Sequence, residues 1–152
     1  MKNYRKDRIP DQDEAVREIE QIYRDLAERP IDRNCTLQTE CCQFKRTKIV
    51  PYITKGEALL AAKAVRAAGR KEMPEAVDGA CPLLNARSGK CMIYKQRPFG
   101  CRTHFCEAAG GPYGRGEVLD LIRRLEAVDA RLLGHGPVTL PVAVKAALLE
   151  LR

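Results

Sequence analysis

The spacing of apolar and charged residues predicts a long helix near the start of the chain. After Asp11, apolar side chains recur at intervals of three and four residues with charged residues between them: Ala15, Val16, Ile19, Ile22, Tyr23 and Leu26. Asp11 or Asp13 can cap this helix, and Pro30 ends it. We therefore expect one helix within the N-terminal segment 1–34.

A capping signal predicts the second helix. Thr54 and Glu57 have the spacing of a capping box, and an Ala- and Leu-rich run follows as far as Gly69, a residue suited to end a helix. Just before it, residues 49–53 form an apolar run that Pro51 restricts to the edge of a sheet. We expect a short edge strand that leads directly into a helix.

The last part of the chain, 107–152, predicts two more helices. Glu117 begins an amphipathic segment that Gly134 ends, and Pro141 is suited to the first turn of a terminal helix. The chain is therefore expected to form one mainly α domain over 1–152. About four helices would surround a cysteine-rich, loop-built centre.

The middle of the chain has weaker patterns. Two short apolar runs, 81–84 and 91–94, flank a polar segment of turn-forming residues at 85–90, which favours a short hairpin. Residues 97–102 predict a tight turn or a single helical turn. The glycine-rich segment 110–116 lacks the spacing of a phosphate-binding loop, and we interpret it as a hinge.

Charge and cysteine content change the picture of this middle part. The 152 residues are 45% hydrophobic and 31% charged, which excludes a disordered or fibrous protein. Segment 35–106 has 13 basic and 5 acidic residues, a net charge of +8, whereas 1–34 has 8 and 9 and 107–152 has 6 and 6. All seven cysteines lie in the basic segment and are the candidate metal ligands: Cys35, Cys41, Cys42, Cys81, Cys91, Cys101 and Cys106.

The coincidence of basic residues and thiols favours a metal centre over a nucleic-acid site. Metal-bound cysteines are anionic thiolates, so neighbouring Lys and Arg would offset their charge. The N-terminus is charged without a following apolar run, and no stretch has the roughly 18–20 apolar residues of a membrane span. We therefore expect a cytoplasmic protein with no membrane contact. Disulfides are disfavoured in the cytoplasm, and an odd number of cysteines would leave one thiol unpaired in a disulfide framework. Both points favour metal binding over disulfides.

Several cysteine-containing blocks together carry a family resemblance. In order, they are Cys35-Thr-Leu-Gln-Thr-Glu-Cys-Cys42, Cys81-Pro-Leu-Leu84, Gly89-Lys-Cys-Met-Ile-Tyr94, Arg97-Pro-Phe-Gly-Cys-Arg102 and finally Cys106. Over 35–106, about half the chain, the sequence resembles the YkgJ-type cysteine-cluster family, the CxxCxxCC zinc- or iron-chelating domain. The resemblance implies metal chelation, often as an iron–sulfur cluster. A related cysteine cluster occurs in flagellin lysine methylases.

The chain departs from the family pattern at one position. Gln38 stands where the family has a cysteine, so seven thiols replace the usual eight. His104, a water or an open coordination position would take the place of the eighth ligand, although an ordinary histidine is the favoured interpretation of His104. Arg97 and Arg102 are candidates to donate hydrogen bonds to sulfur, or else to form surface ion pairs.

The favoured hypothesis is a cytoplasmic metal-binding protein with a structural or electron-transfer role. Its cofactor would be iron or an iron–sulfur cluster, with zinc as the alternative. Another hypothesis is a metalloenzyme of group-transfer or redox type related to the methylases. A third is a basic zinc module that binds nucleic acid, which the small number of aromatic residues disfavours. The sequence identifies no catalytic residue and no protein partner.

Overall fold

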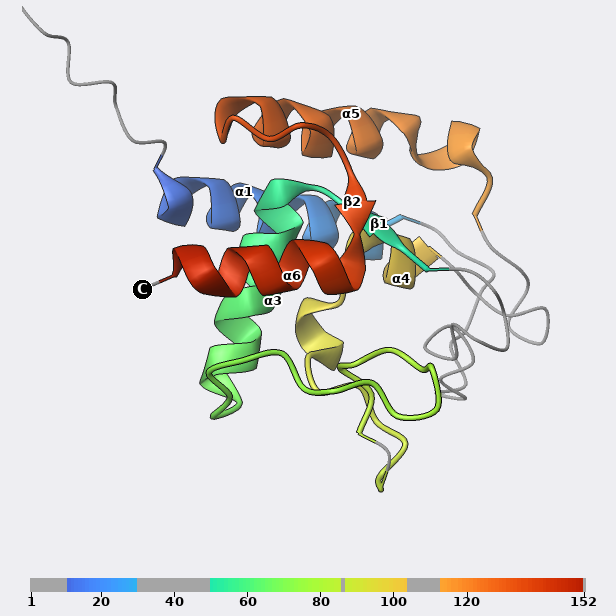
Figure 1. Ribbon diagram of the computed structural model, residues 1–152. Helices are drawn as coiled ribbons and strands as arrows, with labels where there is room; N and C mark the ends of the chain where they lie inside the picture. The colour runs from blue at the N-terminus through green and yellow to red at the C-terminus, as the bar shows by residue number, and fades with distance from the viewer. Residues whose placement is uncertain (1–10, 30–49, 86, 104–112, 152) are drawn as a thin grey trace, which may run out of the picture.

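The computed structural model describes residues 11–29, 50–85, 87–103 and 113–151, and these residues are mainly helical (Figure 1). None of the described helices is long and apolar enough to cross a membrane. The predicted mainly α class is confirmed, and the described residues form four long α-helices and one α-helix of a single turn. In chain order the elements are α1 (Gln12–Ala27), β1 (Tyr52–Ile53), α3 (Lys55–Ala67), the 3-10 helix η2 (Tyr94–Gln96), α4 (Phe99–Thr103), α5 (Arg115–Arg131), β2 (Val138–Thr139) and α6 (Leu140–Glu150).

Helix α3 is the centre of the bundle. It packs against α1, α5 and α6, and Figure 1 shows it crossing the direction of those three helices. The helix is buried continuously from Gly56 to Ala62, mostly through small and aliphatic side chains. A Cβ atom added to Gly56 would lie 2.9 Å from both Ile19 Cδ1 of α1 and Val128 Cγ1 of α5. The glycine therefore allows three helices to meet at one point.

The predicted start of the first helix and the predicted end of the second are confirmed. The Asp11 side chain accepts hydrogen bonds from the backbone N–H groups of Asp13 and Glu14, at 3.0 and 3.1 Å. At the end of α3, Gly69 has a φ of +87°. The N–H groups of Gly69 and Arg70 donate back to carbonyls of the last turn, which is the Schellman motif.

The end of α5 differs from the prediction. The helix stops at Arg131, and the residue with positive φ is Leu133 (φ 59°) instead of Gly134. Gly134 is required for a different reason, because a Cβ there would lie 2.3 Å from Asp129 Oδ1. The helix also begins two residues before Glu117, since the Glu117 side chain accepts a hydrogen bond from the Gly114 N–H at 2.7 Å.

Both predicted extended features are present. The edge strand at 49–53 is β1, which pairs antiparallel with β2 so that Tyr52 faces Thr139 and Ile53 faces Val138. The sequence did not indicate the partner strand β2. The predicted hairpin is a single antiparallel bridge between Leu84 and Cys91, closed by 85–90.

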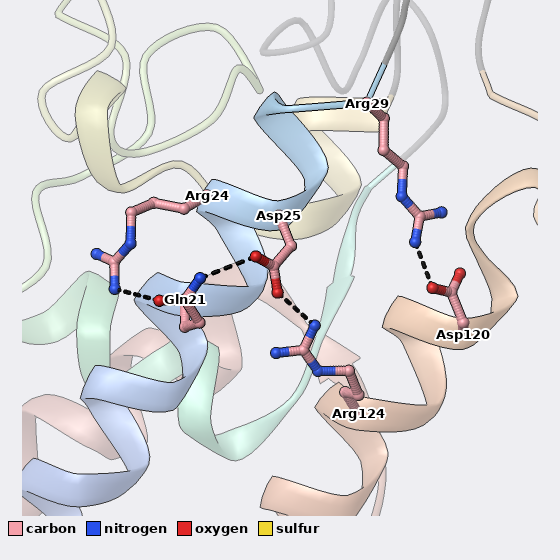
Figure 2. A network of polar contacts seen from close by, with 6 residues as sticks. All are labelled: Gln21, Arg24, Asp25, Arg29, Asp120 and Arg124. Atoms are coloured by element: carbon pink, nitrogen blue, oxygen red, sulfur yellow. Dashed lines mark hydrogen bonds and ion pairs between the residues drawn. The ribbon is translucent and has the colours of Figure 1, made fainter.

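Polar contacts connect α1 to α5 on the surface. Figure 2 shows Asp25 facing Arg124, with an oxygen–nitrogen distance of 2.6 Å, and Arg29 paired with Asp120. The arginine partners hold the pKa values of both aspartates below their ordinary range. Arg29 also donates to the carbonyl of Glu117 at 2.8 Å. Exposed ion pairs of this kind contribute little stability each, but these hold the end of α1 beside α5.

Candidate metal centre

Three of the seven candidate cysteines lie in described residues, each on a separate turn. Cys81 is buried, and its carbonyl accepts a hydrogen bond from the N–H of Leu84 at 3.0 Å. Cys91 faces Leu84 across the hairpin bridge, and Cys101 lies on α4. Both are partly buried against the hydrophobic core. The other four, Cys35, Cys41, Cys42 and Cys106, lie outside the described residues, as do Gln38, His104 and most of the segment 110–116.

Within the described parts of the chain, no group of three or more His, Cys, Asp or Glu residues is placed to hold a metal ion. Cys81, Cys91 and Cys101 therefore do not form a complete ligand set by themselves. With the described residues placed as they are, a metal site with three or more His, Cys, Asp or Glu ligands must include at least one residue outside the described ranges.

Apolar anchors hold the turns that carry these thiols. Leu83 lies between Cys81 and the hairpin and is 1% exposed, and Ile93 follows Cys91 and is also 1% exposed. Pro98 and Phe99, which precede Cys101, are buried too. The predicted helical turn at 97–102 is α4. These buried side chains anchor the backbone of the turns, with Cys81 inside the core and Cys91 and Cys101 partly buried against it.

A buried carboxylate, Glu57, links three helices beside Cys101. Its Oε2 accepts hydrogen bonds from the backbone N–H of Thr54 at 2.9 Å and from the Thr54 hydroxyl at 3.0 Å. Its Oε1 accepts from the N–H of Phe99 at 2.7 Å and from the hydroxyl of Tyr23 at 3.1 Å. Each oxygen faces one backbone N–H, which can only donate, and one hydroxyl, which can also donate, so the partners suit an acceptor-only carboxylate.

The environment shifts the ionisation of these groups. Burial raises the pKa of Glu57, and the hydrogen bonds from Thr54, Phe99 and Tyr23 oppose that rise. Burial and the neighbouring Glu57 carboxylate raise the pKa of Tyr23 well above 10, so its hydroxyl stays a donor. Burial lowers the pKa of Arg102, which nevertheless remains a cation.

Arg97 and Arg102 have other partners than the surface ion pairs considered from the sequence. The Arg102 guanidinium lies over the Tyr23 ring, 4.2 Å from its centroid, and donates to the carbonyls of Arg97 and Lys95, both at 2.6 Å. Arg97 lies 4.0 Å from the centroid of the Tyr94 ring and donates to the Tyr94 carbonyl at 3.0 Å. Among the described residues neither arginine forms an ion pair. Their contacts stabilise the turn that precedes and includes α4.

The charged residues in the segment that forms these turns are all basic. Residues 79–103 contain five basic residues and no Asp or Glu. None of the ion pairs between described residues involves one of these five: Arg87, Lys90, Lys95, Arg97 and Arg102. The turns that carry Cys81, Cys91 and Cys101 therefore have a positive charge that their own segment does not neutralise.

Sequence reasoning missed the part that Glu57 and Tyr23 play beside α4. The sequence predicts Glu57 only as half of a capping box and Tyr23 only as one position of an apolar stripe. One signal was present: Glu57 lies three and four residues before Leu60 and Ala61, on the buried face of an apolar helix. A charged residue on such a face requires buried partners, although the sequence does not say which ones.

Comparison with known proteins agrees with the cysteine pattern. A family model described as CxxCxxCC, putative zinc- or iron-chelating domain, matches residues 33–115, just over half of the chain. The matched range contains all seven cysteines, Glu57, the hairpin and α4. No curated protein and no solved structure matches the chain.

Proposed function

The chain belongs to the CxxCxxCC family of zinc- or iron-chelating domains, and on this premise we propose that its seven cysteines are the metal ligands. An iron–sulfur cluster or iron is the favoured cofactor, and zinc is the alternative. The single observation that carries the proposal is that the family match spans residues 33–115 and so contains every cysteine of the chain.

The chemistry of the donor set fits this assignment. Cysteine thiolates are soft ligands that suit zinc and iron–sulfur clusters, whereas magnesium and calcium require oxygen ligands. Cys81 lies within the core, and Cys91 and Cys101 lie partly buried against it, so none of the three thiols is fully exposed to solvent. Since three described thiols do not complete a site, we assign the remaining ligands to Cys35, Cys41, Cys42 and Cys106.

The charge of the surrounding segment supports the same proposal. A site of four thiolates with zinc or with an oxidised four-iron cluster carries a net charge of about −2. The five basic residues of 79–103, with no acidic residue among them, would offset that charge. This account requires no nucleic-acid partner. We propose a cytoplasmic protein in which the metal has a structural or electron-transfer role.

Elemental analysis of protein purified without oxygen tests the proposal. We expect at least one equivalent of iron or zinc per chain. Iron with acid-labile sulfide and an absorption band near roughly 400 nm would support the cluster. Zinc without a visible band would support the alternative and end the electron-transfer role. Less than one equivalent of either metal would overturn the proposal.

A variant series would identify the ligands. Single Cys→Ser substitutions at each of the seven positions should lower the metal content, and Ser88→Ala, an exposed residue of the hairpin loop, is the matched control. A Cys→Ser variant that keeps its full metal content removes that cysteine from the ligand set.

A further inference from the structure

We infer that Glu57 is a positioning residue for the metal centre, because it fixes the helical turn that carries Cys101. The expected effect on metal affinity rests on the proposed function, but the contacts that support the inference all lie within described residues. It assigns to Glu57 a role beyond the local cap at the start of α3.

The two carboxylate oxygens of Glu57 have separate partners. Among the described residues, Oε2 accepts from Thr54 alone, through the N–H at 2.9 Å and the hydroxyl at 3.0 Å, at the start of α3. Oε1 accepts from Phe99 N–H at 2.7 Å, the shortest of the four bonds, and from Tyr23 at 3.1 Å. Of these bonds, a capping box requires only the one from the Thr54 N–H to Oε2. The Oε1 contacts therefore serve a different purpose, which is to connect α3 with α1 and α4.

Helix α4 depends on such external contacts. It has five residues, and a helix of one turn is not stable by itself. Phe99, its first residue, is held by Glu57 through the backbone and by burial of its ring. Arg102, directly after Cys101, lies over the ring of Tyr23, whose hydroxyl donates to the same Glu57 oxygen.

Cys101 thus lies between Phe99 and Arg102, and both of these residues are connected to the Glu57 carboxylate. Phe99 connects to Glu57 directly, and Arg102 connects to it through Tyr23. Since a metal ligand must stand within a few tenths of an ångström of its productive position, loss of this support should weaken binding. Outer partners of metal ligands typically contribute about 10- to 100-fold in affinity, and we expect an effect near the lower value.

Asp129 offers a matched control. It lies in the last turn of α5, is 5% exposed, and its carboxylate accepts from the Lys55 N–H at the start of α3, at 2.8 Å. Its other partner is the Gly136 N–H at 3.0 Å, in the connection between α5 and β2, and no described contact joins it to α4. Asp129→Asn therefore disturbs the same helix end without touching the turn of Cys101.

The experiment compares Glu57→Gln, Asp129→Asn and the unaltered full chain. Glutamine is nearly isosteric with glutamate but presents an NH₂ group to donors, so it cannot satisfy all four partners. The first readout is chelator competition with the metal found by elemental analysis. We expect Glu57→Gln to release metal at about 10-fold lower chelator concentration and Asp129→Asn to behave like the unaltered chain.

The second readout needs no metal. In metal-free protein, the alkylation rates of Cys101 and Cys91 by iodoacetamide are measured by mass spectrometry. We expect the Cys101-to-Cys91 ratio to rise in Glu57→Gln and to stay unchanged in Asp129→Asn. If Glu57→Gln does not fold, Tyr23→Phe takes its place, since it removes only one Oε1 bond.

The outcomes separate the two proposals. Equal metal affinity in Glu57→Gln and Asp129→Asn would overturn the positioning role and leave the proposed function intact. If the unaltered chain binds no metal, the proposed function fails, and the alkylation ratio alone decides the inference. In that case a ratio that does not change in Glu57→Gln would overturn it.

Discussion

Replacing Gly56 by alanine should destabilise the protein, although alanine is the better helix former. The added Cβ would lie 2.9 Å from Ile19 Cδ1 and from Val128 Cγ1, closer than carbon atoms pack. Both neighbours are 0% exposed and so have little space to move into. Overpacking of this kind costs about 1–3 kcal/mol. The gain in helix propensity is at most about 1 kcal/mol, so we expect a net loss of stability.

Gly116 provides the control, because it occupies the same position in another helix. Gly56 is the second residue of α3 and Gly116 the second residue of α5. A Cβ added to Gly116 meets nothing within 4 Å. Gly116→Ala should therefore show the propensity gain alone, up to about 1 kcal/mol. The difference between the two variants isolates the cost of overpacking, about 1–3 kcal/mol.

Urea denaturation followed by circular dichroism measures the free energy of unfolding for both variants in the same metal state. Gly56→Ala should unfold at lower urea than the unaltered chain, and Gly116→Ala at equal or higher urea. If the two variants are equally stable, α1, α3 and α5 do not meet as closely as the structure shows, and the reasoning is refuted.

Two further predictions concern polar contacts. Tyr23→Phe keeps the ring but removes the hydroxyl that donates to buried Glu57 at 3.1 Å, so unfolding free energy should fall by about 1.5–3 kcal/mol in urea titrations; an unchanged midpoint would contradict this. The Arg124 guanidinium lowers the pKa of Asp25, so that the pair stabilises the folded state above the unfolded carboxyl pKa of about 3.9 and loses this effect as pH falls. Asp25→Asn should therefore lose less stability than the unaltered chain as the pH is lowered below about 4, and parallel pH profiles would argue against the contact.

The helix boundaries that were predicted correctly depend on neighbours in sequence. Asp11 caps α1 through residues two and three positions later, and Gly69 ends α3 through bonds within the same turn. Such interactions are local, so the residue types and their spacing suffice to identify them. The end of α5 was misplaced because Gly134 is needed for its contact with Asp129, while Leu133 takes the left-handed conformation.

In the metal centre, too, the sequence predicts some features and leaves others to the tertiary structure. The cysteines, their basic surroundings and the family they indicate were all evident in the chain, because ligand chemistry depends on residue type and approximate spacing. The support of Cys101 was not evident. Glu57 reaches Tyr23 across 34 positions and Phe99 across 42, and only the packing of α1, α3 and α4 brings these residues together. A pattern in the sequence can show that a buried charge needs partners, but the tertiary structure decides which residues they are.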